Sequence, residues 1–140
     1  RPPRSTLFPY TTLFRSLIGH RILLNFGHTL AHVLENQFPD RYLHGEAVAI
    51  GLAAATRLST LHTGLDAEAH QRVLRMLRAL HLPESSPPEL DAASVMQVMA
   101  SDKKRAATSI RFVLLEAIGK ARVETLPLDT ALARKLLGAS

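Results

Sequence analysis

The 140-residue sequence contains no cysteine and no tryptophan, and it has only two tyrosines. The absence of cysteine excludes disulfide bonds and thiolate metal sites, so any metal would have to be held by His, Asp or Glu. No uncharged apolar run reaches the roughly 18 residues that a membrane-spanning helix needs. Hydrophobic residues make up 46% and charged residues 21% of the chain. The length supports one domain, and the composition, which is that of an ordinary folded protein, excludes wholesale disorder.

The basic charge of the chain is concentrated near its N-terminus. The formal net charge is +5, but Arg1, Arg4 and Arg15 lie in the first 16 residues, which contain no acidic residue. The remaining residues carry 14 basic and 12 acidic side chains. A nearly neutral body gives little support for nucleic-acid binding. We therefore expect neither a nucleic-acid nor a membrane partner.

The first 16 residues differ in character from the rest of the chain. Residues 6–16, TLFPYTTLFRS, resemble the translation of a short-read sequencing adapter. They lack the apolar core and the small-residue cleavage site of a secretory signal. We expect residues 1–16 to be foreign and unpacked, residues 17–140 to form the domain, and the native protein to continue upstream of about Leu17. The alternative is a genuine arm rich in strand-forming residues.

From residue 17 onward the apolar pattern is mainly helical. It predicts a buried helix within residues 17–37, with Asn25 as its N-cap and Pro39 just beyond its end. Residues 44–62 form a second predicted helix, closed by Gly64. This helix is rich in glycine and alanine, which predicts that it is central, buried and closely approached by another helix.

The rest of the chain predicts three more helices and one β-hairpin. A helix over residues 66–81 should bury Val73, Leu74, Leu77 and Leu80. Its three evenly spaced arginines (Arg72, Arg75 and Arg78) indicate a solvated face rather than a nucleic-acid surface, because Glu68 accompanies them. Residues 90–101 should form a helix with Val95, Met96 and Met99 inward. Residues 110–118 and 121–126 read as a hairpin, and Asp129 should cap a final helix that ends at Gly138.

Three histidines are the most informative chemical feature. His28 and His32 are four residues apart, so they project from one face of a helix. His44 follows the turn at Pro39, and an antiparallel helix pair would bring it close to His28. Neutral imidazole is the commonest metal ligand, and two from adjacent helices suit zinc, although packing or solvation are the alternatives. The metalloprotease pattern is excluded because Thr29 stands where its glutamate would be.

Several basic and amide side chains are candidates for holding an anion. Arg21 offers a planar donor fork, and Asn25 lies four residues after it. Lys103 and Lys104 follow Asp102 and are either anion ligands or part of a solvated loop.

Three motifs carry a resemblance to a known family. They are RILLNFGHTLAH at residues 21–32, LHGEAVAIG at 43–51, and DKK at 102–104 followed by IRFVLL at 110–115. In order and spacing they resemble the C-terminal half of 3-dehydroquinate synthase over about residues 17–137. The implied fold is mainly α, the C-terminal helical domain of the dehydroquinate-synthase-like fold with a small β-hairpin.

The resemblance implies a cytoplasmic lyase of the shikimate pathway, which leads to the aromatic amino acids. That family converts 3-deoxy-D-arabino-heptulosonate 7-phosphate to 3-dehydroquinate and phosphate, with NAD and zinc or another divalent metal such as cobalt. By resemblance, His28 and His44 are two of three protein zinc ligands. Arg21, Asn25, His32 and one of Lys103 or Lys104 would hold the carboxylate and phosphate of the small-molecule substrate.

The chain also departs from that family. The N-terminal NAD-binding domain, with the third zinc ligand, is not in the sequence, and no glycine-rich phosphate loop occurs. We expect NAD to be bound mainly by that domain, the full-length enzyme to be a homodimer, and this chain alone to be inactive. The alternatives are a related sugar-phosphate cyclase, a polyol dehydrogenase, or a helical binding module without chemistry.

Overall fold

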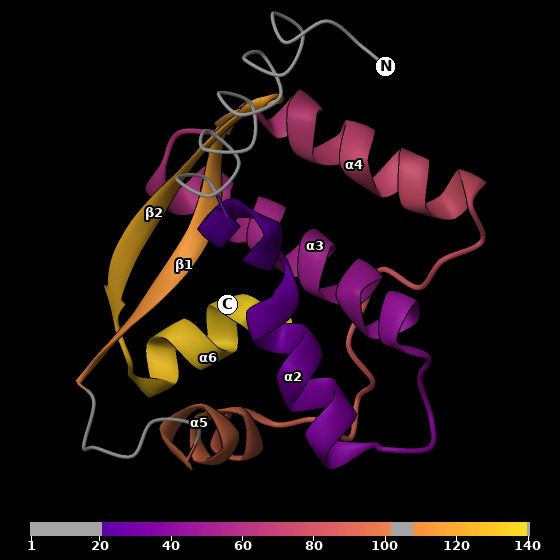
Figure 1. The fold of residues 1–140 in the computed structure, drawn as a ribbon, viewed down its shortest axis with the longest axis vertical. Coiled ribbons are helices and arrows are strands. Elements are labelled where there is room, and N and C mark those ends of the chain that lie inside the picture. The colour runs from indigo at the N-terminus through magenta and orange to yellow at the C-terminus, as the bar shows by residue number, and fades with distance from the viewer. Residues whose placement is uncertain (1–20, 102–107, 140) are drawn as a thin grey trace, which may run out of the picture.

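The computed structural model describes residues 21–101 and 108–139 of the chain (Figure 1). The adapter-like residues 1–16, together with Lys103 and Lys104, lie outside the described residues. Within the described part, every helix is too short or too polar to cross a bilayer. The elements in chain order are a 3-10 helix η1 (Arg21–Asn25), α2 (His28–Gln37), α3 (His44–His62), α4 (Ala67–Ala79), α5 (Ala92–Ser101), β1 (Ser109–Ala117), β2 (Lys120–Pro127) and α6 (Thr130–Leu137). The mainly helical fold with one hairpin is the predicted one.

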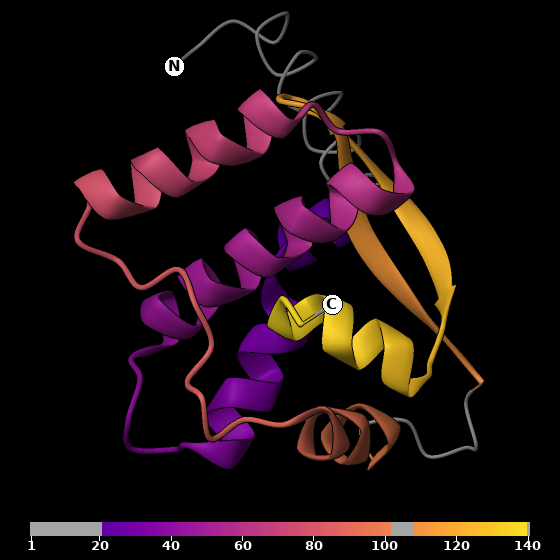
Figure 2. The same cartoon turned by 180° about the vertical axis from the view of Figure 1, so that it is seen from behind.

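Helix α3 is the centre of the domain. It contacts α2, α4, α6 and β1, and Figures 1 and 2 show it between α4 on one side and α2 with α6 on the other. A Cβ atom built on Gly51 of α3 would lie only 1.8 Å from the carbonyl oxygen of Gly27. No side chain larger than hydrogen fits between two backbones this close. The predicted close approach to α3 is therefore confirmed, and it occurs where α2 begins.

The start of α2 differs from the prediction. Its N-cap is Gly27, which has a left-handed backbone with φ 79°, and Asn25 is instead the last residue of η1. Glycine adopts this conformation without the steric cost that a Cβ brings. The prediction of Asn25 as N-cap was wrong because the chain makes one more short turn before the helix starts. Asn25 is exposed and its side chain is available for other contacts.

Three of the four residues in the predicted apolar stripe of α4 pack against α3. Val73, Leu74 and Leu77 contact Ala49 and Ala53 of α3. The predicted burial of Leu80 was wrong, since it is 60% exposed. The helix ends at Ala79, and the chain then changes direction at His81, which has a positive φ of 57°. Leu82 packs against this small cluster after the turn.

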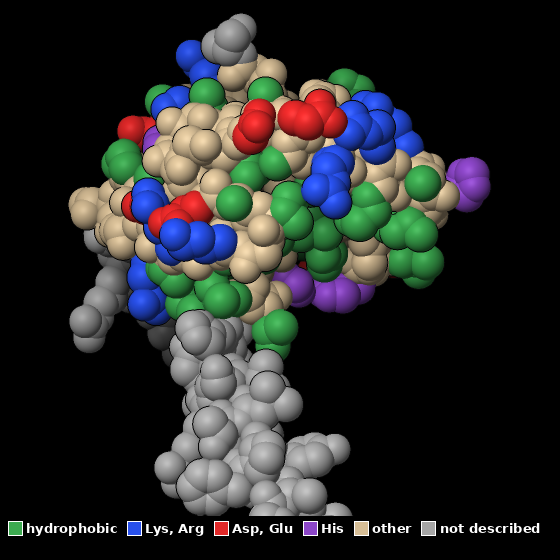
Figure 3. Space-filling model, turned by 90° about the horizontal axis from the view of Figure 1, so that it is seen from above, with side chains coloured by type: hydrophobic (Ala, Val, Ile, Leu, Met, Phe, Trp, Pro, Cys, Tyr) green, Lys and Arg blue, Asp and Glu red, His purple; other side chains and the backbone are tan. Residues whose placement is uncertain are grey.

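The arginines of α4 lie on its solvated face, as the pattern predicted. Arg72, Arg75 and Arg78 are exposed, and two of them form ion pairs, Arg75 with Glu68 and Arg78 with Glu84, both at 2.6 Å. Figure 3 shows acidic and basic side chains near one another on the face it presents.

The β1–β2 hairpin completes the core. Its strands pair antiparallel, with Ile110 opposite Leu126, and Figure 2 shows the hairpin along one side of the helices. The buried side chains of Ile110, Phe112, Leu114 and Leu126 join one hydrophobic core with residues of α2, α3, α5 and α6. In α5, Val95 and Met99 are buried and Met96 packs partly against the core, as predicted.

Polar contacts also tie α3 to its neighbours. The Ser59 hydroxyl accepts a hydrogen bond from the Leu115 backbone at 2.9 Å, and the Thr63 hydroxyl donates to the Leu115 carbonyl. The Arg57 guanidinium donates to the carbonyls of Lys135 (3.3 Å) and Leu136 (2.6 Å) at the end of α6. These bonds satisfy backbone groups that helix and strand ends leave without partners. Asp129 accepts from the Leu132 backbone and Gly138 ends α6, so both predicted caps are confirmed.

Candidate metal and anion site

Helices α2 and α3 bring the predicted histidines together. The chain doubles back at the turn between them, so that α2 and α3 pack against each other and run in roughly opposite directions (Figure 1). The ring centroids of His28 and His44 are 5.6 Å apart, and those of His28 and His32 are 6.5 Å apart. In Figure 3 some histidine side chains lie next to one another at one edge of the molecule, and others lie apart from them. The expected proximity of His28 and His44 is present, whereas their role as metal ligands stays a prediction.

The Nδ1 atoms of His28 and His44 both face an oxygen. His28 Nδ1 lies 3.1 Å from the carbonyl oxygen of Phe26, and His44 Nδ1 lies 2.6 Å from Oε1 of Glu35. A carbonyl oxygen can only accept, so Nδ1 of His28 carries the hydrogen. In the neutral ring, the lone pair is then on Nε2, the atom free to bind a metal.

Glu35 also lies near the third histidine, with its Oε2 3.7 Å from Nδ1 of His32. The side chains of His32 and His44 are 61% and 62% exposed, whereas that of Glu35 is 31% exposed. Within residues 21–101 and 108–139, no group of three or more His, Asp or Glu side chains is arranged to hold a metal ion. The Glu35 carboxylate contacts the Nδ1 side of His44, so the described part of the site offers two imidazole donors.

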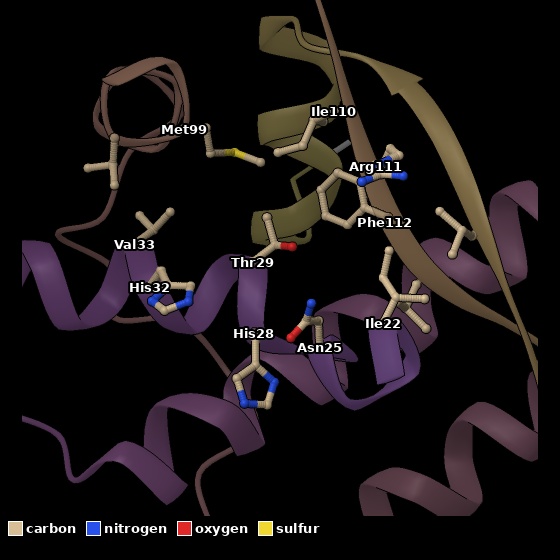
Figure 4. A pocket seen from close by; sticks show the side chains of 13 residues that line it. Ile22, Asn25, His28, Thr29, His32, Val33, Met99, Ile110, Arg111 and Phe112 are labelled. Carbon is tan, nitrogen blue, oxygen red and sulfur yellow. The ribbon is translucent and has the colours of Figure 1, made fainter. Parts of the chain in front are cut away.

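A pocket of about 340 Å³ lies beside the histidines, between η1, α2, α5 and the hairpin (Figure 4). In Figure 4 the Asn25 and Thr29 side chains lie near His28, and Met99, Ile110 and Phe112 form the other side. The lining thus has a polar part and an apolar part. Its polar residues are Asn25, His28, Thr29, His32 and Arg111; its apolar residues are Ile22, Val33, Val98, Met99, Ile110, Phe112, Val113 and Val123.

Two of the predicted anion ligands lie at this pocket. Asn25 and His32 line it together with His28, and Arg21 begins the short helix that ends at Asn25. Lys103 and Lys104 lie outside the described residues, but α5 and β1, the elements before and after them, both line the pocket.

Two polar residues of the site were not singled out from the sequence. Arg111 lines the pocket from β1 and is exposed between inward-facing Ile110 and Phe112. The alternation of apolar and polar residues at the start of this strand could have identified Arg111, because a charged residue between two buried ones must face away from the core. Glu35 lies on the same helix face as His28 and His32, seven and three residues after them.

The chain matches a family model described as 3-dehydroquinate synthase C-terminal, over residues 18–105. Two curated proteins named 3-dehydroquinate synthase are among its relatives. The one from Dichelobacter nodosus is 43% identical over 106 residues, covering 75% of this chain and 29% of that protein. The one from Pseudoalteromonas atlantica is 41% identical over 120 residues, covering 85% of this chain and 34% of that protein. The chain therefore spans about a third of the length of these relatives.

Solved structures of sugar-phosphate cyclases share the fold. The 2-epi-5-epi-valiolone synthase from Streptomyces hygroscopicus subsp. jinggangensis, solved with NAD⁺ and Zn²⁺ bound, has a TM-score of 0.69 and 26% identity. The match covers 81% of this chain and 31% of that one. A 2-deoxy-scyllo-inosose synthase complexed with carbaglucose-6-phosphate, NAD⁺ and Co²⁺ has a TM-score of 0.68 at 20% identity. The match covers 83% of this chain and 34% of that one. The predicted dehydroquinate-synthase-like fold is confirmed.

Proposed function

Because this chain belongs to the 3-dehydroquinate synthase family and matches its C-terminal domain, we propose that it forms the metal-binding and anion-binding half of that lyase. The whole enzyme would convert 3-deoxy-D-arabino-heptulosonate 7-phosphate to 3-dehydroquinate and phosphate. The observation that carries the proposal is the pair of imidazoles, His28 and His44, with ring centroids 5.6 Å apart, beside a pocket that His28 lines together with Asn25, His32 and Arg111.

The donor chemistry of the pair fits a zinc or cobalt ion. His28 is held by a backbone carbonyl in the tautomer whose Nε2 lone pair is free. Imidazole nitrogen is a preferred ligand of both metals. When bound, such an ion supplies Lewis-acid chemistry by polarising a coordinated oxygen. We propose that His28 and His44 bind this ion along with a carboxylate ligand from the N-terminal domain of the whole enzyme. That domain would also supply the NAD site.

The polar residues of the pocket would hold the negative groups of the substrate. Arg111, Asn25 and His32 present donors of three kinds, a guanidinium, an amide and an imidazole, around the pocket. A phosphate or carboxylate is best held by several such donors, and a charged guanidinium gives the strongest of these bonds. Arg21 and one of Lys103 or Lys104 complete the proposed set. The proposal extends to a cytoplasmic homodimer as the whole enzyme.

A related sugar-phosphate cyclase is the second candidate function, since proteins of that kind share the fold. Sequence identity favours the synthase. The chain is 41–43% identical to relatives named 3-dehydroquinate synthase but 20–26% identical to the two solved cyclases described above. The donor set around Arg111 argues against another alternative, a polyol dehydrogenase, because it suits a phosphorylated acid better than an uncharged polyol.

A chimera tests the proposal. Residues 18–139 would replace the matching segment of the full-length Dichelobacter nodosus relative, and phosphate release from the heptulosonate phosphate would be measured with NAD⁺ and Zn²⁺. We expect turnover in the chimera and its loss in the His28→Ala and His44→Ala variants. The 140-residue chain alone should release no phosphate. A chimera that melts cooperatively but is no more active than its double-histidine variant would contradict the proposal.

A further inference from the structure

We infer that Glu35 is a positioning residue, whose carboxylate holds the His44 ring so that Nε2 faces the metal position. This inference rests on the proposed metal site and adds a residue to it. Glu35 Oε1 lies 2.6 Å from Nδ1 of His44, within hydrogen-bonding distance of it. Glu35 is on α2 and His44 is the first residue of α3, so the bond also crosses between the two helices.

The chemistry of the bond determines which nitrogen is free. A carboxylate accepts hydrogen bonds, so its contact with Nδ1 selects the tautomer in which Nδ1 carries the hydrogen. An unrestrained neutral histidine in water favours the opposite tautomer, with the hydrogen on Nε2. The His44 side chain is 62% exposed, so little packing restrains its ring. Without Glu35, the ring would rotate freely and the nitrogen needed for the metal would carry a hydrogen.

The two candidate ligands are held by different means. His28 Nδ1 bonds to the backbone carbonyl of Phe26, which no substitution removes, whereas His44 depends on a side chain. The second oxygen of Glu35 lies 3.7 Å from Nδ1 of His32, so one carboxylate lies between a metal-binding and an anion-binding candidate. Carboxylates that orient ligating histidines in this way tune metal sites in many proteins. Glu35 is half-buried, which limits its own motion.

The first test measures the tautomer directly in the metal-free protein. Histidine ¹⁵N NMR spectra of the full 140-residue chain would be recorded at about pH 8, where an ordinary imidazole is neutral. We expect His44 to carry its hydrogen on Nδ1, and the Glu35→Ala variant to move it to Nε2. Glu35→Gln should keep the wild-type tautomer, because its amide oxygen can still accept. The matched control is Glu68→Ala, which removes an exposed glutamate paired with Arg75 on α4. The same His44 tautomer in wild type and Glu35→Ala would overturn the inference.

The second test measures Zn²⁺ affinity by competition with a chelator. Loss of an outer carboxylate costs metal sites about 10- to 100-fold in affinity, so Glu35→Ala should weaken binding by at least about tenfold. Glu35→Gln should lose less, and Glu68→Ala should lose nothing. If Zn²⁺ leaves the wild-type His28 and His44 signals unchanged, the proposed metal site fails, while the tautomer measurement still decides the role of Glu35. Unchanged Zn²⁺ affinity in Glu35→Ala, with binding that His44→Ala abolishes, would also overturn the inference.

Discussion

The two ends of helix α3 use polar side chains in opposite ways. Near the C-terminal end, Ser59 is fully buried and, with Thr63, bonds to the backbone of β1. At the N-terminal end, His44 is mostly exposed and bonds to a side chain of α2. The C-terminal half of α3 is therefore bonded to the backbone of β1, whereas its N-terminal end presents an exposed side chain to solvent. Buried polar groups that bond to backbone support the fold, and exposed ones that bond to each other leave atoms free for a ligand.

The difference has an energetic basis. Removing one partner of a buried hydrogen bond leaves the other partner without water, which costs about 1–3 kcal/mol. An exposed histidine regains water when its partner is removed, so the fold loses little. Substitutions should therefore change the free energy of unfolding most in the middle and C-terminal half of α3, and least at its N-terminus.

Gly51→Ala should have the largest effect, because the new methyl group would meet the Gly27 carbonyl at 1.8 Å. Backbone cannot move aside as a flexible side chain can, so we expect a loss of about 3 kcal/mol or more. Urea unfolding followed by circular dichroism measures it. The control in the same helix is Gly45→Ala, where nothing lies within 4 Å. That change should be neutral or stabilising by up to about 1 kcal/mol. Equal losses for the two alanine variants would show that the close backbone approach is not real.

Ser59→Ala should have the next largest effect. It removes the oxygen that accepts from the Leu115 backbone at 2.9 Å and leaves that N–H without this partner. We expect a loss of about 1–3 kcal/mol in the same unfolding measurement. Thr60→Ala is the matched control, since the Thr60 hydroxyl is only half-buried and bonds within its own helix, to Arg57. Its loss should stay within about 0.5 kcal/mol. If both variants are equally stable, the link between α3 and β1 contributes nothing measurable.

The free energy of unfolding should depend on pH through His70, which lies on α4. Burial, followed by the nearby charge of Arg57, lowers the pKa of His70 below its ordinary 6.5, although Glu84 opposes this. The unfolded chain then binds the proton more readily than the folded one. Stability from this group is therefore full above about pH 6.5 and is lost as the pH falls below it. Unfolding midpoints at about pH 7.5 and pH 5.5 would check this, and the decrease should be smaller in His70→Gln. An equal or larger decrease in that variant would contradict the assignment.

His44→Ala should have the smallest effect on stability, within about 0.5 kcal/mol, because its ring is exposed. The same variant should lose Zn²⁺ binding in a chelator competition, which separates function from stability at this end of α3. His62→Ala, at the other end of the helix, is the control and should bind Zn²⁺ as the wild type does. A large destabilisation by His44→Ala would remove the distinction between the two halves.

Sequence patterns within short segments were sufficient to predict the helices and the proximity of His28 and His44. Residues 44–62 were predicted as a helix with the observed bounds, and the short turn at Pro39 made the proximity of His28 and His44 predictable. The errors came from features that no local rule contains. Asn25 has a favoured capping side chain, but the close contact of Gly27 with Gly51 places the helix start later in the chain.

The pocket was beyond sequence reasoning for a different reason. Its lining combines η1 and α2 with α5 and β1, which follow far along the chain. Arg111 appears in the sequence only as a charge within a strand, and it becomes part of the pocket when β1 packs beside η1. Glu35 was visible on the face of His32, but its contact with His44 depends on how α2 and α3 cross. Pairings of this kind are determined by tertiary packing.

The bonds from Arg57 to α6 bear on how the protein is made. Their acceptors lie 78 and 79 residues further along the chain. A ribosome adding about 5–20 residues per second needs several seconds or more to deliver them after α3 has been synthesised. During that interval the central helix lacks two of its covers, β1 and α6, and its apolar surface is open to unwanted association.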